Sequence, residues 1–93
     1  MSMEDLNNLR EQLDKINIQL LEILNDRAKI VQKIGEKKLE LGRTEAYDPK
    51  REAEIFEYLF KNNAGPYDNE MIKNIFKQVF DESTKLQEKL LKK

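Results

Sequence analysis

The fold of this chain is decided by residues 6–42, LNNLREQLDKINIQLLEILNDRAKIVQKIGEKKLELG. Apolar residues recur there at alternating steps of three and four, the heptad pattern of paired α-helices, so we predict one long helix from about Glu4 to Leu41. One position of the pattern holds a charged residue. The pattern, called the heptad stripe below, consists of Leu6, Leu9, Leu13, Ile16, Leu20, Ile23, Arg27, Ile30, Ile34 and Leu41.

Local signals agree with the bounds of this helix. Ser2 followed by Asp5 predicts an N-terminal cap, and Gly42 predicts the C-terminal end. Gly35 lies inside the helix, where glycine costs about 1 kcal/mol relative to alanine. Two interpretations of Gly35 stay open: a tolerated surface position, or a point where another backbone or a ligand approaches closely.

Two shorter helices are predicted after it. Asp48-Pro49 is a strong helix start, and the breaker at residues 62–66, NNAGP, ends that helix. The third helix is expected over residues 68–91. We therefore predict an all-α fold with one long, one short and one medium helix, forming a single domain over residues 1–93.

The length of the first helix predicts a partner chain. A helix of about 37 residues is about 55 Å long. A compact domain of this size has a radius of gyration of only about 13 Å. The two shorter helices cannot cover such a rod along its whole length. We therefore predict an intertwined helical-bundle homodimer in which the long helices pair.

Composition excludes several classes of protein. The chain has 17 Lys plus Arg against 18 Asp plus Glu, so it lacks the basic surplus of nucleic-acid-binding proteins. The absence of Cys and His removes disulfides, thiolate chemistry and the commonest metal ligand. No apolar run is long enough to span a membrane, and the acidic, polar N-terminus does not resemble a signal peptide. We expect a cytoplasmic protein with no nucleic-acid or membrane partner.

Charged and polar residues interrupt the apolar faces. Arg27 occupies the heptad stripe, and Lys38, eleven residues later, returns to within about 20° of the same helix face, about 16 Å along the axis. The two side chains can clamp one small anion between them. Ser83 and Gln87 interrupt the third helix at i and i+4, so they project side by side. The alternatives are an arginine that extends to solvent and, for Ser83 and Gln87, ordinary helix polarity or hydrogen bonding to a buried backbone group.

A second polar group lies at the start of the second helix. Asp48, Arg51 and Glu52 fall within one turn there, where Asp48 can be a simple cap and the other two a solvated pair. Arg10 precedes Arg27 by about 25 Å along the helix, too far to serve the same pocket within one chain. If the long helices pair antiparallel, Arg10 of one copy approaches the pocket of the other.

These residues favour one kind of chemistry. The set offers cations, an amide and a hydroxyl, with no nucleophile beside a base and no Gly-rich phosphate loop. It is suited to binding a small dianion and to stabilising charge that develops in its transition state.

The chain resembles the AroQ-type chorismate mutases over nearly its full length. The resemblance is carried by LNNLREQLDKIN, LLEILNDRAKIVQKIGEKK, YDPKREAEIF and VFDESTKLQ, in that order. It implies a Claisen rearrangement of chorismate to prephenate, a step of phenylalanine and tyrosine biosynthesis in the shikimate pathway, without metal or cofactor.

The resemblance also implies roles for single residues. Arg27 and Arg10 of the partner subunit would bind the two substrate carboxylates. Lys38 would contact the breaking ether oxygen and a carboxylate, and Gln87 would donate a second hydrogen bond to that oxygen. Because a neutral amide donates at any physiological pH, we expect activity that persists at neutral pH.

The resemblance gives the other polar residues secondary roles. Ser83 would assist a ring carboxylate, Glu52 and the backbone near Asp48 would hold the substrate hydroxyl, and Arg51 would add positive potential. Phe80 is bulkier than the aliphatic residue expected beside the pocket, which would tighten the site and weaken turnover.

Two other functions stay open. Similar domains are fused to the N-terminus of DAHP synthases, where they sense prephenate or chorismate. The C-terminal segment KLQEKLLKK has a helical pattern with no stop signal, which permits such a fusion as well as a free-standing enzyme. The other alternative is a ligand-free structural helical dimer, which the heptad stripe favours and its charged position opposes.

Overall fold

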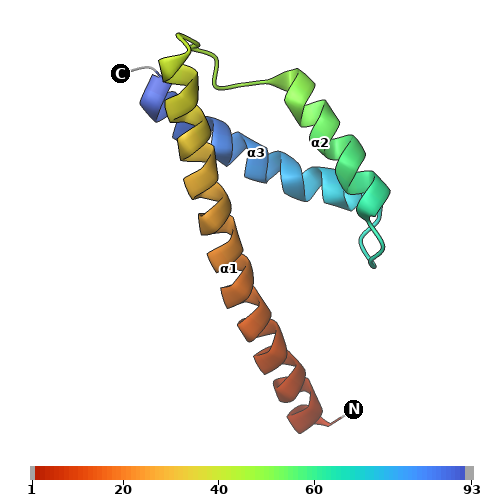
Figure 1. Ribbon diagram of the computed structural model, residues 1–93. Helices are drawn as coiled ribbons and strands as arrows, with labels where there is room; N and C mark the ends of the chain where they lie inside the picture. The colour runs from red at the N-terminus through yellow and green to blue at the C-terminus, as the bar shows by residue number, and fades with distance from the viewer. Residues whose placement is uncertain (1, 92–93) are drawn as a thin grey trace. The chain divides into compact units, whose positions relative to one another are not determined.

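The computed structural model describes residues 2–91 and contains three helices (Figure 1). They are α1 (Met3–Glu40), α2 (Pro49–Asn62) and α3 (Asn69–Leu91), with no strand among the described residues. The predicted all-α class with one long, one short and one medium helix is confirmed. The predicted bounds of the first helix are one residue late at each end. Lys92 and Lys93, part of the C-terminal segment considered above, lie outside the described residues.

The predicted caps form at both ends of α1. The amide of Asp5 donates to Oγ of Ser2 at 3.1 Å, and the amide of Ser2 donates back to Oδ2 of Asp5 at 3.2 Å. Gly42 follows the last turn at φ 72°, the left-handed conformation that glycine adopts without strain. This turn lets the amide of Arg43 donate to the carbonyl of Lys38 at 2.8 Å. The reciprocal cap and the glycine thus fix where the helix starts and stops.

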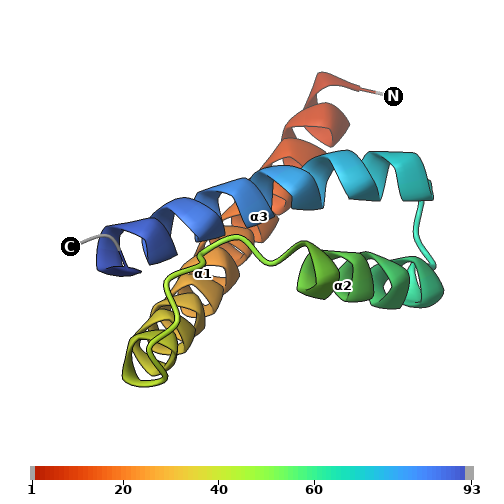
Figure 2. The same cartoon turned by 90° about the horizontal axis from the view of Figure 1, so that it is seen from above.

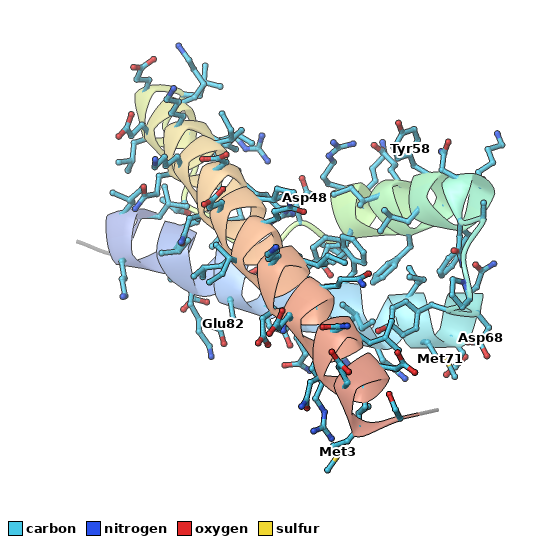
Figure 3. The ribbon with its side chains drawn as sticks, turned by 90° about the horizontal axis from the view of Figure 1, so that it is seen from below. Met3, Asp48, Tyr58, Asp68, Met71 and Glu82 are labelled. Atoms are coloured by element: carbon cyan, nitrogen blue, oxygen red, sulfur yellow. The ribbon has the colours of Figure 1, made fainter. Side chains whose placement is uncertain are left out.

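Aspartates cap the two shorter helices. Oδ1 of Asp48 accepts from the amide of Arg51 at 3.1 Å, and Oδ1 of Asp68 accepts from the amide of Met71 at 2.8 Å. Figure 3 shows Asp48 at the start of α2, and Asp68 and Met71 at the start of α3. The cap interpretation of Asp48 is therefore confirmed.

The chain divides into two compact units, Met1–Ile30 and Val31–Lys93, which are described separately. The first unit is the N-terminal part of α1. Its heptad stripe is solvent-exposed in the single chain, since Leu9, Leu13, Ile16, Leu20 and Ile23 are between 49% and 62% exposed. Among residues 2–91, no helix has the length and apolar character needed to cross a membrane.

The second unit contains the end of α1, together with α2 and α3. Phenylalanines join α2 to α3, which lie side by side in Figures 1 and 2. The rings of Phe56 and Phe80 meet edge to face at 5.1 Å between centroids, and Phe60 and Phe76 extend the cluster at 5.9 and 6.1 Å. Phe80 is buried in this cluster. Its large ring therefore joins α2 to α3, which is a packing role that the sequence did not predict.

Candidate functional site

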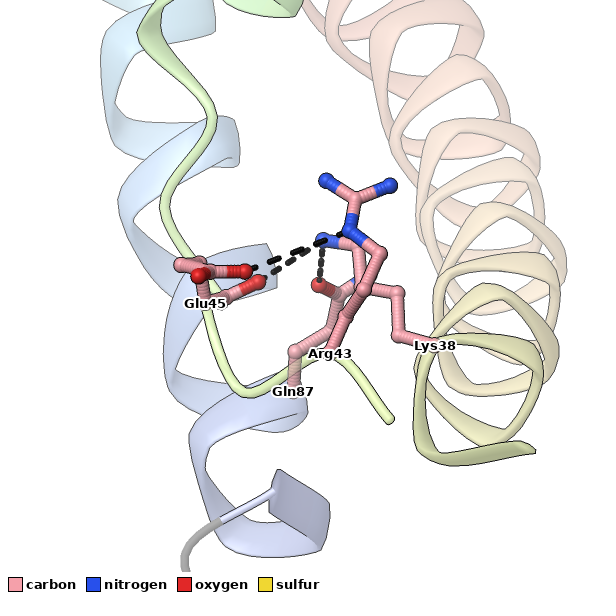
Figure 4. A network of polar contacts seen from close by, with 4 residues as sticks. All are labelled: Lys38, Arg43, Glu45 and Gln87. Atoms are coloured by element: carbon pink, nitrogen blue, oxygen red, sulfur yellow. Dashed lines mark hydrogen bonds and ion pairs between the residues drawn. The ribbon is translucent and has the colours of Figure 1, made fainter. Parts of the chain in front are cut away.

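Lys38 and Gln87 form the buried polar centre of the second unit. Lys38 is 8% exposed and Gln87 is 6% exposed, and they are the buried polar or charged residues of the described chain. Nζ of Lys38 donates to Oε1 of Gln87 at 2.7 Å, which ties the end of α1 to α3 (Figure 4). The structure thus brings together two residues that are 49 positions apart in the sequence.

The orientation of the Gln87 amide follows from its two partners. Lysine is only a donor, so the oxygen of the amide must face Lys38. The nitrogen then faces α1 two turns earlier, where Nε2 donates to the carbonyl of Val31 at 3.1 Å. An amide nitrogen carries two hydrogens. One of them serves Val31, so the other is available to a ligand.

Lys38 also reaches the loop that follows α1. Nζ donates a second hydrogen bond to the backbone carbonyl of Glu45 at 3.2 Å. The side chain of Glu45 lies 3.9 Å from Nε of Arg43 in an exposed ion pair, drawn in Figure 4, which contributes little stability because water screens it. Two of the three N–H donors of Lys38 are therefore used, and both acceptors are neutral oxygens.

The electrostatics of this centre favour an anion. Among residues 2–91, Lys38 forms no ion pair with a carboxylate. A cation removed from water is stabilised best by an opposite charge. The third N–H of Lys38 and the second N–H of Gln87 can together donate to one negatively charged oxygen. In chemical terms the arrangement can hold a carboxylate or stabilise an oxygen on which charge develops.

The face of α1 that packs within the chain differs from the heptad stripe. Its buried residues are Val31, Gly35 and Lys38, whereas Ile30 and Ile34 of the stripe are exposed. The stripe therefore does not describe how α1 contacts its own chain. The apolar pattern does not identify this buried face, because Gly35 and Lys38 are not apolar residues. The surface interpretation of Gly35 is wrong, since side chains of α3 approach it closely.

Ser83 lies one turn before Gln87 on α3. Its Oγ donates to the carbonyl of Val79 at 2.8 Å, a common bond of serine within helices. The hydroxyl is partly buried.

The start of α2 carries Asp48, Arg51 and Glu52. Nη1 of Arg51 lies 3.5 Å from Oε2 of Glu54 in an exposed pair. The solvated pair of Arg51 with Glu52, one of the alternatives left open above, is therefore not the pair that the structure shows. Burial raises the pKa of the Glu52 carboxyl above its ordinary value, and the charges of Asp81 and Asp48 raise that pKa further, against an opposing effect of Lys77. Glu52 is thus placed where its negative charge is disfavoured.

The two predicted clamping arginines lie in the first unit. Arg27 is half-buried on α1, and this burial lowers the pKa of its guanidinium, which stays charged at physiological pH. Arg10 is exposed on the same helix. The clamp between Arg27 and Lys38, and the approach of Arg10 to a second copy, stay predictions.

The sequence did not predict which backbone acceptors serve this centre. The carbonyls of Val31 and Glu45 hold Gln87 and Lys38, but a carbonyl leaves no trace in the sequence. No group of three or more His, Cys, Asp or Glu that could hold a metal ion occurs within residues 2–91.

Comparison with known families is consistent with this geometry. Residues 9–88 match the family Chorismate mutase type II. Two curated relatives are bifunctional chorismate mutase/prephenate dehydratases. The one from Aquifex aeolicus (strain VF5) is 33% identical over 92 residues, and the one from Pseudomonas aeruginosa is 32% identical over 91 residues. These alignments cover 95% and 94% of this chain, which spans about a quarter of the length of either relative.

Solved structures with the same fold include two chorismate mutases. Form II of the enzyme from Thermus thermophilus has a TM-score of 0.86 at 40% identity, covering 90% of this chain and 94% of that one. The enzyme from Helicobacter pylori in complex with prephenate has a TM-score of 0.87 at 33% identity, covering 97% of both chains.

Proposed function

Because the chain belongs to the chorismate mutase type II family, we propose that it catalyses the rearrangement of chorismate to prephenate. The observation that carries the proposal is the buried Lys38, held by Gln87 and paired with no carboxylate within residues 2–91. The related structure from Helicobacter pylori binds prephenate, a small dianion of the kind that such a cation would hold.

The proposed mechanism is electrostatic. As the ether bond of chorismate breaks, negative charge builds up on its oxygen. The third N–H of Lys38 and the second N–H of Gln87 donate to that oxygen, so they stabilise the transition state more than the ground state. Removing one donor of this kind costs about 10²–10³ in kcat in other enzymes. The amide of Gln87 donates without changing its protonation state, so the activity persists at neutral pH.

Other side chains bind and orient the substrate in this proposal. Arg27 and Arg10 of the partner subunit hold the two carboxylates and keep the flexible substrate in its compact, reactive conformer. The hydroxyl of Ser83, one turn from Gln87, would donate to a ring carboxylate by turning away from the carbonyl of Val79. The remaining members of the set are Asp48, Arg51 and Glu52.

Glu52 suits the hydroxyl group of the substrate. A carboxyl whose negative charge is disfavoured gains from a hydrogen-bond donor, and a substrate hydroxyl supplies one. Asp48 contributes through the backbone that its cap organises. Arg51, paired with Glu54 at the surface, adds positive potential without direct contact.

We propose that the working unit is a homodimer, with residues 1–93 forming one domain of each copy. The support is the exposed heptad stripe of α1, which is too long a run of Leu and Ile to remain in water in a stable protein. Pairing of two stripes buries it in the manner of a helical bundle. The partner then supplies Arg10 to the site.

The alternative of a sensing domain attached to a DAHP synthase has less support. The curated relatives described above carry prephenate dehydratase in their names instead. A ligand-free structural dimer would not account for a lysine that is buried without an anionic partner among the described residues.

The test is an assay of chorismate consumption by the purified chain, with prephenate identified as the product. Turnover supports the proposed function. Thermal stabilisation by millimolar prephenate without turnover would replace it with a sensing role. If the chain neither turns over chorismate nor is stabilised by prephenate, the ligand-free structural dimer remains as the explanation.

A further inference from the structure

Gly35 lies at the buried point where α1 meets α3, one turn after Val31 and one turn before Lys38. A Cβ atom placed on Gly35 would lie 3.0 Å from Cδ1 of Leu90 and 3.5 Å from Cγ of Gln87. It would also lie 4.0 Å from Cα of Gln87. The first distance is tighter than ordinary van der Waals contact, so a side chain at position 35 must displace atoms of α3.

The amide of Gln87 spans Gly35 on α1. It donates to Val31 on one side at 3.1 Å and accepts from Lys38 on the other at 2.7 Å. Both bonds depend on how closely the two helices approach at Gly35, because donor–acceptor distances in protein hydrogen bonds extend only to about 3.2 Å.

We propose that Gly35 is a positioning residue for Gln87. Its missing side chain sets the separation of α1 and α3 at which one amide bridges Val31 and Lys38 and keeps its second N–H aimed at the substrate. The catalytic consequence rests on the proposed function, whereas the effect on the amide does not.

Backbone conformation does not explain this glycine. Among the described residues, the glycine with positive φ is Gly42, so Gly35 has an ordinary helical backbone that any residue adopts. Alanine is the better helix former at such a position. If Gly35 had no role in spacing, Gly35→Ala would raise the melting temperature and leave kcat unchanged.

The chain offers a matched control. A Cβ on Gly65 would meet nothing within 4 Å, so Gly65→Ala makes the same chemical change in open space. We expect Gly35→Val to lower kcat on chorismate about 10²-fold, towards the loss of one oxyanion donor, with a smaller change in KM. Gly35→Ala is expected to lower kcat about 10-fold, because the flexible side chain of Leu90 can move to accommodate part of the added methyl group. Gly65→Ala keeps the parent kcat.

A double variant separates positioning from general damage. If Gly35 acts through Gln87, adding Gly35→Val to Gln87→Ala lowers kcat by less than about threefold beyond Gln87→Ala alone. If instead the kcat losses of the two single variants multiply in the double variant, Gly35 acts elsewhere than through Gln87 and the proposal is overturned.

The side-chain amide of Gln87 provides a readout that needs no activity. Its resonances in a ¹H–¹⁵N spectrum are identified by their loss in Gln87→Ala. They should shift in Gly35→Val, or in Gly35→Ala if the valine variant does not fold, and stay unchanged in Gly65→Ala. Unshifted resonances in a folded variant overturn the proposal. If these resonances shift in the Gly35 variant but the parent chain itself does not turn over chorismate, the positioning role is supported and the proposed function is refuted.

Discussion

The two ends of α1 differ in which residues they expose and which they bury. In residues 3–30 the heptad stripe is long, apolar except for Arg27, and mostly exposed in the single chain. In residues 31–40 the packed face is short and consists of Val31, Gly35 and Lys38. The first arrangement leaves much apolar surface exposed, which the proposed dimer would bury. The second has little apolar area, and it places a lysine where α3 can hold it.

The difference separates assembly from chemistry along one helix. A run of leucines and isoleucines gives association energy in proportion to the area removed from water. A buried lysine costs free energy, which is recovered only through hydrogen bonds or an anion. Changes to the leucines and isoleucines of the first region should therefore act mainly on association, and changes in the second region mainly on catalysis.

The largest effect is expected from a charge within the exposed stripe. Ile16→Glu places a carboxylate in the proposed dimer contact, where an unpaired buried charge costs several kcal/mol, roughly 10³-fold or more in the dimer dissociation constant. Sedimentation analysis at micromolar concentration should show the parent as a dimer and the variant as a monomer. Lys15→Glu, the adjacent position outside the stripe, is the control and should remain dimeric. A parent chain that sediments as a monomer would contradict the dimer itself.

The next effect falls on catalysis without affecting assembly. Lys38→Ala and Gln87→Ala each remove one donor to the ether oxygen, so each should lower kcat by about 10²–10³. Steady-state assays and sedimentation of the same samples measure both properties. Lys37→Ala and Gln78→Ala remove the same residue types at exposed positions on the same helices and should match the parent. Parent-like turnover in both Lys38→Ala and Gln87→Ala would rule out the proposed donors.

Much of the fold was predictable from the sequence because its signals are local. The helix boundaries follow from Ser2, Gly42, Asp48 and the NNAGP breaker, each of which acts within a few residues. These signals depend on backbone hydrogen bonds that any structure containing the segment must satisfy. The three helices were therefore predicted to within about two residues, the usual scatter between helix assignments.

The site was predictable only as a set of residue types. Lys38 and Gln87 were singled out as polar residues on apolar faces, but their bond depends on the register between α1 and α3. That register is set by contacts such as Gly35 with Leu90, which no local pattern encodes. The pairing of Arg51 with Glu54 was missed for a different reason, since exposed ion pairs differ little in energy from their alternatives.

A mixing experiment tests whether the two regions meet in one site. Arg10→Ala and Lys38→Ala are each expected to be nearly inactive alone. If each site takes Arg10 from the partner subunit, a mixed dimer contains one intact site, because both defects fall in the other. Random pairing in an equal mixture gives half mixed dimers, so about a quarter of the sites, and of the parent kcat, should return. No recovery after verified subunit exchange would place Arg10 outside the partner's site.

The smallest effect concerns Glu52, whose charge the second unit disfavours. Burial and the charges of Asp81 and Asp48 raise the pKa of its carboxyl, so the folded chain holds this proton more tightly than the unfolded chain. Stability must then fall as the pH rises from the ordinary pKa of a glutamate through the raised one. Glu52→Gln removes this loss, so the variant should melt higher than the parent at neutral pH and equally below about pH 4.

The size of this shift is limited by exposure, because water screens most of the interaction. We expect about 2 °C or less, measured by circular dichroism at a series of pH values and at one protein concentration. Glu57→Gln, an exposed position on the same helix, is the control and should show no pH-dependent difference from the parent. If Glu52→Gln instead melted lower at neutral pH, the carboxylate would be stabilised in the folded chain. Glu52 would then have to meet the substrate hydroxyl as a fully charged acceptor.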